Sequence, residues 1–373
     1  MPADLVVTAE ELEHRTIRRV DLKADRAAFL DTRIPGSETK INYPLIGPGV
    51  SENAEQVVPV TEPHGFNLGA AVMPAGTVNN LHLHFTAEVF MCLAGTWQFR
   101  WGVDGADGEA VVSEGDVISI PTWIFRGFTS QTDDAWLYTA LGRDVSGGLI
   151  WAPAVIEKAA ATGRHLRVDN QIIDTEPGEF PEGVELVAPL TEEQLGALPK
   201  VDVAQMRERL ATPSDLQWSV APFLDSDLPG GGAQLACVVG YGITEDRMQR
   251  PRLSDPHGLS LAWLRAEAGR GVGRHRISEA QALIVKSGRI RITLNETDPV
   301  SVDIGAYDTM SIPRDAWRAV ESIGDEPAQW VVITEGDGRV YLDWAPALVD
   351  DARAKGVVRD ANGYVAPAAL VRG

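Results

Sequence analysis

The sequence predicts an all-β protein built from two similar barrels, one in each half of the chain. Three observations support this: an internal repeat, short alternating strands separated by turn residues, and helical patterns confined mainly to the ends of each repeat. The chain of 373 residues is long enough for two domains, each with its own core. Its 36 glycines and 23 prolines suit strands joined by tight turns.

The repeat is clearest at the end of each half. Residues 151–163 read WAPAVIEKAAATG and residues 344–356 read WAPALVDDARAKG, with seven of thirteen positions identical. His82 and His275 keep the same spacing, 193 residues, and so do Trp151 and Trp344. A near-constant offset through a whole domain indicates a duplication, so both halves should share one fold.

The expected strands alternate polar and apolar residues and are followed by turn-forming residues. They are 96–101, 110–112, 117–120 and 136–141 in the first half, and 289–294, 302–304 and 330–334 in the second. Short helices are predicted at 9–14, 154–161, 192–198, 203–210 and 347–355. Many short strands with turn signals between them indicate a sandwich or a barrel.

These patterns divide the chain into two domains and a connection. We expect an N-terminal barrel over residues 1–173 and a C-terminal barrel over residues 201–373. The acidic, proline-bearing stretch of residues 174–200 is the expected linker.

Composition narrows the class of partner and the compartment. Lys and Arg total 33 against 53 Asp and Glu, a formal charge of −20, and no basic cluster is present, so nucleic acid is not an expected partner. Cys92 and Cys237 stand among apolar neighbours and predict buried free thiols in a reducing cytoplasm. No stretch approaches the roughly 20 apolar residues that span a bilayer, and no secretory leader is evident, so we expect no membrane partner.

A candidate metal site lies between Gly76 and Gly95. His82 and His84 are two positions apart on an expected strand, so their side chains point the same way. Glu88 follows a tight connection and can return at the start of the next strand. Two imidazoles and a carboxylate leave coordination positions open, which suits Fe(II), with Mn, Ni, Cu or Zn as alternatives. The competing interpretation is two exposed or hydrogen-bonded histidines without a metal.

The string from Gly76 to Gly95 resembles the first motif of the cupin superfamily, and residues 115–121 resemble the start of its second motif. The resemblance covers roughly residues 65–145 and 258–340. It implies two tandem cupin (double-stranded β-helix, or jelly-roll) barrels with short flanking helices. In layout the chain is similar to gentisate-type dioxygenases. That similarity implies an Fe(II)-dependent dioxygenase that uses O₂ on a small aromatic or oxo acid and assembles as a homo-oligomer.

The second cupin motif normally supplies a further histidine, and here that position is Arg126. Arginine stays protonated and has no lone pair for a cation. Two interpretations remain open: Arg126 anchors an anionic group of the substrate, which we favour, or it forms a buried ion pair with Glu88 that replaces the metal. Arg126 and Glu88 are the expected catalytic residues.

Further substrate-binding candidates surround this motif. Trp97 on a strand and Trp123 beside Arg126 suggest an aromatic-lined pocket, although core packing is the commoner role of such aromatics. Gln98 and Arg100, on the face opposite Trp97, and Tyr138 on a later strand are further candidates; the full set is Arg126, Gln98, Arg100, Trp97, Trp123 and Tyr138.

The second repeat has lost most of the motif. His275 is kept, but Ile277 replaces the second histidine, Gln281 replaces the glutamate, and Arg318 stands at the last histidine position. One imidazole cannot build a metal site, so this barrel is expected to be structural or an interface, with anion binding as the alternative. Because one fold hosts many activities, two other functions stay open. They are a metal-free small-anion-binding protein, with Arg126 and Arg318 in equivalent pockets, and a cupin isomerase, lyase or decarboxylase.

Overall fold

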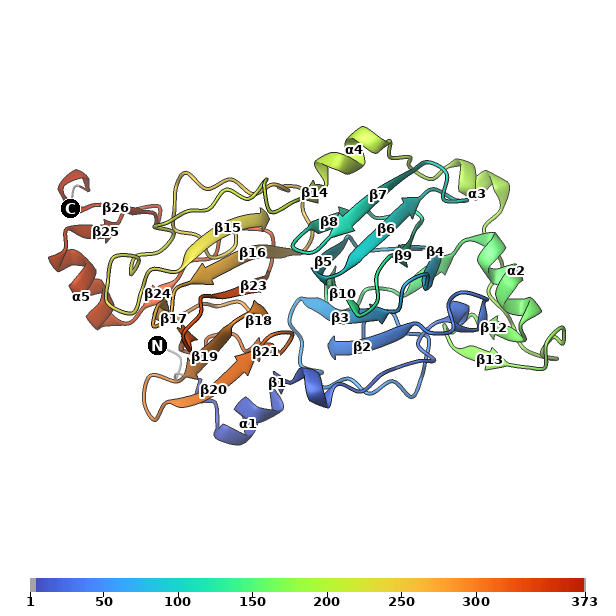
Figure 1. Ribbon diagram of the computed structural model, residues 1–373, viewed down its shortest axis with the longest axis horizontal. Helices are drawn as coiled ribbons and strands as arrows, with labels where there is room; N and C mark the ends of the chain where they lie inside the picture. The colour runs from blue at the N-terminus through green and yellow to red at the C-terminus, as the bar shows by residue number, and fades with distance from the viewer. Residues whose placement is uncertain (1–4, 372–373) are drawn as a thin grey trace. The chain divides into compact units, whose positions relative to one another are not determined.

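The computed structural model describes residues 5–371 and contains two compact units, each built around a barrel of two β-sheets (Figure 1). One unit runs from Lys23 to Ser214. The other comprises the chain up to Leu22 together with the chain from Asp215 onward. The predicted all-β class with short helices is confirmed. Within the described residues, no helix is long and apolar enough to cross a membrane.

The unit from Lys23 to Ser214, here called the first barrel, contains a six-stranded and a five-stranded sheet. Their strand orders are β14-β8-β5-β10-β3-β2 and β11-β4-β9-β6-β7. The strands are β2 (Ile41–Ile46), β3 (Phe66–Met73), β4 (Val78–His84), β5 (Glu88–Ala94), β6 (Thr96–Trp101), β7 (Gly108–Ser113), β8 (Val117–Ile120), β9 (Arg126–Ser130), β10 (Ala135–Gly142), β11 (Leu149–Trp151) and β14 (Leu210–Ala211). The unit also contains η2 (Leu30–Arg33), α2 (Pro153–Ala161), the hairpin β12 (Arg164–Leu166) and β13 (Ile172–Asp174), α3 (Glu192–Gly196) and α4 (Val203–Glu208).

The other unit, here called the second barrel, repeats this architecture. Its sheets have the orders β1-β21-β18-β23-β16-β15 and β20-β19-β22-β17-β24. The strands are β1 (Thr16–Ile17), β15 (Gln234–Val239), β16 (Leu259–Ala266), β17 (Gly271–Arg276), β18 (Gln281–Ser287), β19 (Arg289–Leu294), β20 (Val300–Gly305), β21 (Thr309–Ile312), β22 (Arg318–Ile323), β23 (Ala328–Glu335) and β24 (Asp343–Trp344). It also contains α1 (Ala9–His14), η1 (Arg19–Asp21), α5 (Pro346–Ala354), the hairpin β25 (Val357–Arg359) and β26 (Val365–Pro367), and η3 (Ala368–Leu370).

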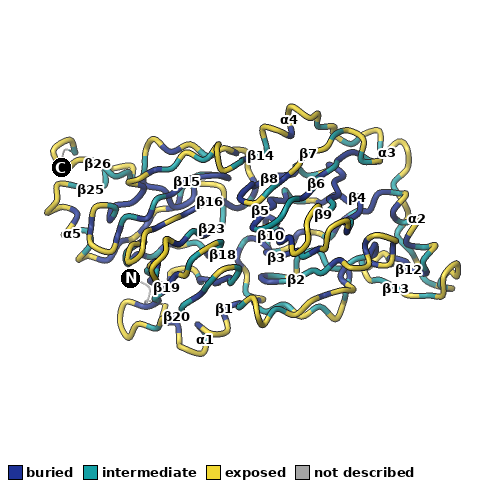
Figure 2. Tube along the Cα trace, in the orientation of Figure 1, coloured by how far each residue is buried: buried dark blue, intermediate teal, exposed yellow. Residues whose placement is uncertain are grey.

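Side-chain alternation places the core of the first barrel between its two sheets. Trp97, Phe99 and Trp101 of β6 are all buried, and Phe99 packs edge to face on Phe90 of β5 at 5.0 Å between ring centroids. Figure 2 shows the buried strands inside each barrel and the exposed loops around them. Since neighbours along a strand point to opposite faces, this aromatic row decides which face of β6 is internal.

The two barrels agree in strand register as well as in order. His82 of β4 pairs with Arg126 of β9, and His275 of β17 pairs with Arg318 of β22. In both barrels the register shifts just before the histidine, a bulge of the kind that re-aims side chains at functional sites. The motif glycine Gly95 has φ 79°, and a Cβ there would lie 2.5 Å from that of Ala135, so only glycine fits this turn.

The boundaries of the units differ from the predicted ranges because each half contributes its first segment to the other barrel. Helix α1 follows the cap residue Thr8, and β1 then pairs with β21. Helix α4 follows the cap residue Asp202, and β14 then pairs with β8. These segments, here called the first arm (residues 8–17) and the second arm (residues 202–211), begin 194 residues apart. Sequence analysis placed each arm with the barrel that follows it, because edge pairing of this kind leaves no local pattern.

Candidate metal centre and its pocket

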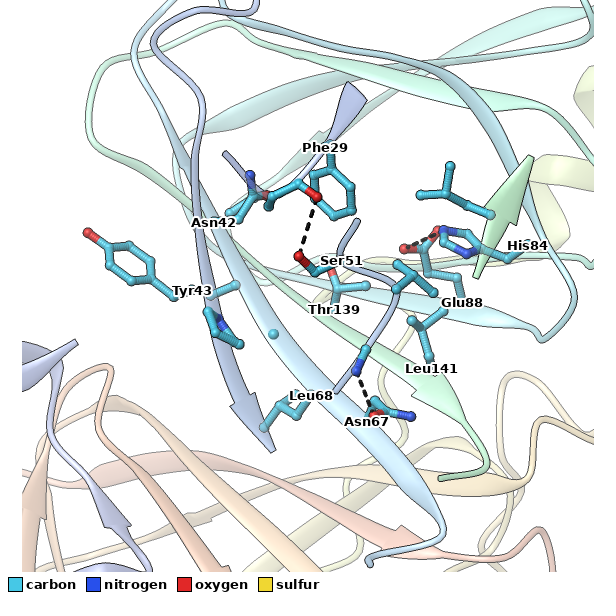
Figure 3. A pocket seen from close by; sticks show the side chains of 18 of the residues that line it. Phe29, Asn42, Tyr43, Ser51, Asn67, Leu68, His84, Glu88, Thr139 and Leu141 are labelled. Atoms are coloured by element: carbon cyan, nitrogen blue, oxygen red, sulfur yellow. Dashed lines mark hydrogen bonds and ion pairs between the residues drawn. The ribbon is translucent and has the colours of Figure 1, made fainter. Parts of the chain in front are cut away.

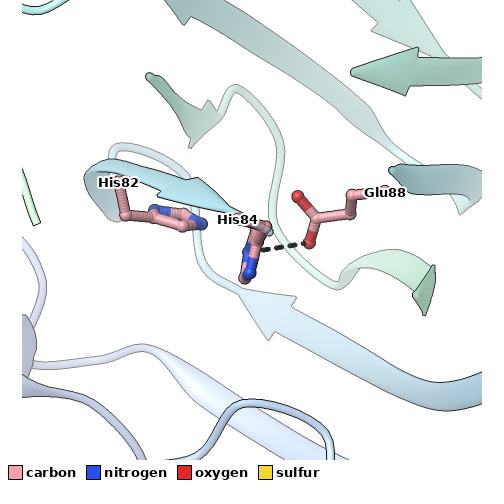
Figure 4. A group of neighbouring side chains, drawn as sticks. All are labelled: His82, His84 and Glu88. Carbon is pink, nitrogen blue, oxygen red and sulfur yellow. Dashed lines mark ion pairs between the residues drawn. The ribbon is translucent and has the colours of Figure 1, made fainter. Parts of the chain in front are cut away.

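His82 and His84 lie at the end of β4 and point to the same side, toward Glu88 at the start of β5 (Figure 4). Leu83 between them and Leu81 before them pack into an apolar cluster on the opposite face. One ligand atom from each of His82, His84 and Glu88 lies within 4.8 Å of the others, and all three residues are buried. The structure therefore brings together the three residues that the motif singled out.

A backbone hydrogen bond orients the first histidine. His82 Nδ1 lies 2.7 Å from the carbonyl oxygen of Asn80, and donation there leaves Nε2 with its lone pair available. His84 Nε2 lies 3.5 Å from Glu88 Oε1, and the two imidazole rings are nearly perpendicular, at 88°. Metal-binding histidines commonly have the second nitrogen fixed in this way.

Burial keeps both imidazoles neutral. It lowers the pKa of His82 to about 3, with the positive charge of Arg126 as the next cause. Burial also lowers the pKa of His84 well below its ordinary value, again with the positive charge of Arg126 as the next cause. Near pH 7 two imidazole lone pairs therefore face the carboxyl group of Glu88. Burial raises the pKa of Glu88, although the positive charge of Arg126 acts to lower it.

Arg126 forms the buried ion pair that was one of its two predicted roles. Its Nε and Nη2 lie 2.9 and 2.8 Å from Glu88 Oε2, and Nη1 donates to the carbonyl oxygen of Ile124 at 3.0 Å. The side chain is fully buried and does not line the adjoining cavity. The substrate-anchoring role that we favoured is therefore not supported, because the guanidinium is held by Glu88 and the backbone.

The residues present fit a divalent ion with three protein ligands. Two neutral imidazole nitrogens and Glu88 Oε1, which Arg126 leaves free, form a donor set of the two-histidine, one-carboxylate type. Because the three ligand atoms lie within 4.8 Å of one another, His82, His84 and Glu88 would be the residues that hold such an ion. The nearby charge of Arg126 opposes a second cation, so we expect modest metal affinity.

A cavity of about 110 Å³ adjoins these residues, and Figure 3 shows it from close by. Its walls are largely apolar and come from β2, β3 and β10 and from the segments around residues 28 and 50. Asn42, Ser51, Gln56, Asn67, Asn79 and Thr139 supply polar groups. No lysine or arginine lines it, so Glu88 is the cavity's only charged residue.

The predicted substrate-binding residues lie elsewhere. Trp97 is in the core, so Gln98 and Arg100 face outward, and Gln98 donates to Glu109 at 2.8 Å. Neither residue lines this cavity, because both lie on the external face of β6.

Trp123 and Tyr138 do not reach the cavity either. Trp123 is partly exposed and packs edge to face on Phe85, with ring centroids 5.2 Å apart. Tyr138 lies on β10, where successive side chains point to opposite faces of the sheet. Thr139 and Leu141 line the cavity, so Tyr138 points to the other face.

Sequence analysis missed the polar layer beneath the site. Lys40 is buried, forms an ion pair with Asp31, and donates to Asn79 Oδ1 at 2.9 Å. Asn79 in turn lines the cavity, and its amide nitrogen lies 3.5 Å from His82 Nδ1. The repeat could have pointed to Lys40. At the offset of 193 its equivalent is Ala233, so the lysine is a feature of the first barrel alone.

The second barrel has no comparable space. The cavity beside His275 measures about 10 Å³, room for at most one water molecule. Arg318 Nη1 donates to Gln281 Oε1 at 2.7 Å and is therefore occupied. The predicted structural role of this barrel suits this geometry, whereas an anion pocket does not.

Two cupin barrels in one chain, with the candidate metal ligands in the first, define a bicupin fold. Solved structures of Bacillus subtilis oxalate decarboxylase share it. The structure at pH 4.6 has a TM-score of 0.53 and 13% identity, over 94% of this chain and 84% of that one. A structure from a study of the substrate binding mode of oxalate decarboxylase has a TM-score of 0.51 and 13% identity. One from a study of the Mn(II) centres of the Bacillus subtilis enzyme has a TM-score of 0.51 and 12% identity, and each match covers 89% of this chain and 78% of the other.

At these identities the likeness shows the fold, not the activity. No protein-family model and no curated protein matches the sequence. The resemblance to gentisate-type dioxygenases gains no support from the oxalate decarboxylase structures, whose common feature with this chain is the double barrel.

Proposed function

We propose that this chain is a metal-dependent cupin enzyme whose first barrel acts on a small carboxylic acid by decarboxylation or a related lyase reaction. One observation carries the proposal: two neutral imidazoles and a carboxylate within 4.8 Å of one another beside a cavity of about 110 Å³. The fold shared with the Mn(II)-containing oxalate decarboxylase supports the choice of reaction class.

In this proposal His82, His84 and Glu88 Oε1 hold the ion. When bound, a divalent metal polarises a carboxylate or carbonyl oxygen. The chain's own residues do the rest. Arg126 fixes Glu88 in place, and the apolar walls exclude bulk water. The side-chain nitrogen of Asn42, buried and without a hydrogen-bond partner in the described part of the chain, can donate to an oxygen of the acid.

The size of the cavity favours a small acid over the aromatic substrate expected from the sequence. An engineered cavity of about 150 Å³ just accepts benzene in another protein, so about 110 Å³ does not take a substituted aromatic ring as a whole. We therefore prefer a decarboxylase or lyase to the dioxygenase of the sequence analysis. Mn(II) becomes the first metal to test, with Fe(II), Ni, Cu and Zn beside it.

A second candidate is a small-molecule-binding protein without a metal. The observation in its favour is the Arg126–Glu88 ion pair, which neutralises the buried carboxylate without any ion. Such a protein would bind acids through Asn42 and the cavity walls alone.

Metal analysis of untagged protein decides between the two. We expect about one divalent ion per chain, lost in His82→Ala and retained in the matched control His275→Ala, which removes the equivalent histidine of the second barrel. The metal-loaded protein is then incubated with oxalate, malonate and 2-oxo acids while CO₂ release and O₂ uptake are recorded. CO₂ release without O₂ consumption supports the proposal, and stoichiometric O₂ uptake supports a dioxygenase. Absence of metal in protein reconstituted with each ion supports the binding protein.

A further inference from the structure

A second pocket, here called the side pocket, adjoins the cavity of the candidate metal centre. It measures about 480 Å³, within the range of small-molecule binding sites. It shares four residues with the cavity: Pro48, Gly49, Leu149 and Trp151. The other lining residues are Phe85, Val145, Ser146, Gly147, Gly148, Ile150, Leu166, Val168, Asn170 and Val187.

The side pocket is apolar and uncharged. None of its lining residues is charged, and its only polar side chains, apart from the Trp151 indole, are Ser146 and Asn170. Phe85, Val145 and Val168 keep 40%, 81% and 56% of their surface exposed, which is costly for apolar groups unless something covers them. The lining therefore suits an alkyl or aryl group rather than an ion.

The second barrel provides an internal comparison. At the offset of 193, Gly147 and Gly148 correspond to Val340 and Tyr341. Val340 is buried, and its backbone nitrogen donates to the carbonyl oxygen of Gly242 at 2.7 Å, which closes the loop. The buried side chain of Val340 thus stands in the second barrel where Gly147 has none in the first, whereas Tyr341 keeps 62% of its surface exposed.

The first barrel holds the corresponding loop open. Gly49, the counterpart of Gly242, accepts instead from the hydroxyl of Ser146 at 2.7 Å. A Cβ on Gly147 would lie 3.2 Å from the ring of Phe85, so glycine is what keeps this space clear. The barrel with the candidate metal ligands is therefore also the one with open space beside them.

The side pocket is also close to the ligands themselves. Phe85 directly follows His84, and the backbone of Gly148 interacts with His84. Leu149 and Trp151 of β11 pair in register with His84 and His82. The two pockets therefore adjoin along the wall that Pro48, Gly49, Leu149 and Trp151 form.

We propose that the side pocket binds an uncharged alkyl or aryl part of the substrate, whose carboxylate end enters the cavity of the metal centre. The inference rests on the proposed function and narrows its substrate class to carboxylic acids with an apolar extension.

Binding of linear 2-oxo acids from pyruvate to 2-oxooctanoate tests this, by calorimetry on the metal-loaded protein. Each methylene group transferred into an apolar site strengthens binding about fourfold. We expect affinity to rise in this way along the series until the side pocket is filled. A flat series, or one that weakens with length, would overturn the inference.

Two exposed valines provide a matched pair of variants. Val168→Glu places a charge in the side pocket and should abolish the gain with chain length while leaving pyruvate binding unchanged. Val111→Glu changes a valine of similar exposure, 58%, that lines neither pocket and should behave like the parent. An equal gain in Val168→Glu and the parent would place the extension elsewhere.

A neutral probe separates this inference from the proposed function. Indole binding, followed by ligand-observed NMR on protein without metal, needs no acid end. If indole binds and Val168→Glu removes it while no metal or pyruvate is bound, the apolar site stands and the enzymatic proposal fails. If pyruvate binds the metal-loaded protein but indole does not bind and longer acids gain nothing, the metal centre stands and the side pocket is not a binding site.

Discussion

Arg126 and Glu88 form a buried ion pair in which two guanidinium nitrogens approach the same carboxylate oxygen, at 2.8 and 2.9 Å. The equivalent residues of the second barrel, Arg318 and Gln281, are joined at 2.7 Å. The arginine is thus present whether its partner is charged or neutral. Its constant task is structural, and the candidate metal site would depend on the single carboxylate oxygen that it leaves free.

Glu88→Gln copies the arrangement of the second barrel into the first. Because an amide still accepts a hydrogen bond from Arg126, we expect a folded protein with a thermal midpoint within a few degrees of the parent. Loss of the anionic ligand should weaken metal binding by at least the roughly 10–100-fold that loss of a hydrogen-bonding partner of a ligand costs. Metal titration beside a thermal melt measures both, and unchanged metal affinity would count against Glu88 as a ligand.

Arg126→Met removes the cation and leaves a buried carboxylate without its partner. Breaking such a pair costs about 3–5 kcal/mol of unfolding free energy in the absence of metal. A bound divalent ion replaces the lost charge, so Mn(II) should restore more stability to the variant than to the parent. Urea unfolding with and without the metal gives the comparison. The matched change Arg318→Met leaves only a neutral glutamine, and an equal loss there would show that charge is not the cause.

The raised pKa of the buried Glu52 predicts that the free energy of unfolding falls toward alkaline pH. Burial raises its pKa from 4.5 to about 8, while Trp151 Nε1 and the backbone nitrogen of Leu30 donate to it at 2.7 and 2.6 Å. Between these values the folded protein holds a proton that the unfolded chain has released. The free energy of unfolding therefore falls as pH rises through this window and levels off above about pH 8.

Glu52→Gln cannot ionise, so its stability should fall less than that of the parent between pH 5 and pH 8.5. Thermal or urea unfolding at the two pH values measures the difference, with Glu55→Gln as an exposed control. Identical pH dependence in parent and variant would show that Glu52 ionises normally.

Lys40 and Asp31 are a buried ion pair beneath the candidate site. Lys40→Ala gives the first barrel the residue found at the equivalent position 233, but it leaves Asp31 uncompensated. We expect a loss of about 3–5 kcal/mol, partly recovered in the double variant Lys40→Ala, Asp31→Asn. Chemical unfolding of the three proteins checks this. A double variant no more stable than Lys40→Ala would exclude the uncompensated charge as the cause.

Regular periodicity explains what could be predicted from sequence. The two-residue spacing of His82 and His84 fixed their common direction, and the strands at 96–101 and 289–294 were predicted with the bounds that the structure has. The predicted buried positions of Cys92 and Cys237 are confirmed.

Features that depend on distant parts of the chain were not predictable in the same way. Alternation separates Gln98 and Arg100 from Trp97 but does not say which set faces inward, so residues of both faces were named as candidates, and none of them lines the cavity. Asn42 and Ser51 reach the cavity from segments that carry no motif. The partner of Arg126 was one of two possibilities because a strand register, not a local pattern, brings it to Glu88.

The crossed arms make the two halves of this polypeptide mutually dependent. A fragment that stops within residues 174–200 keeps Thr16 and Ile17, whose place is on β21, and lacks Leu210 and Ala211, which cover the edge of β8. Uncovered edges offer unpaired backbone groups to other chains and favour aggregation. Cleavage between the halves would thus leave each fragment prone to aggregate. A mutation that disrupts either arm would destabilise the barrel formed by the other half of the chain.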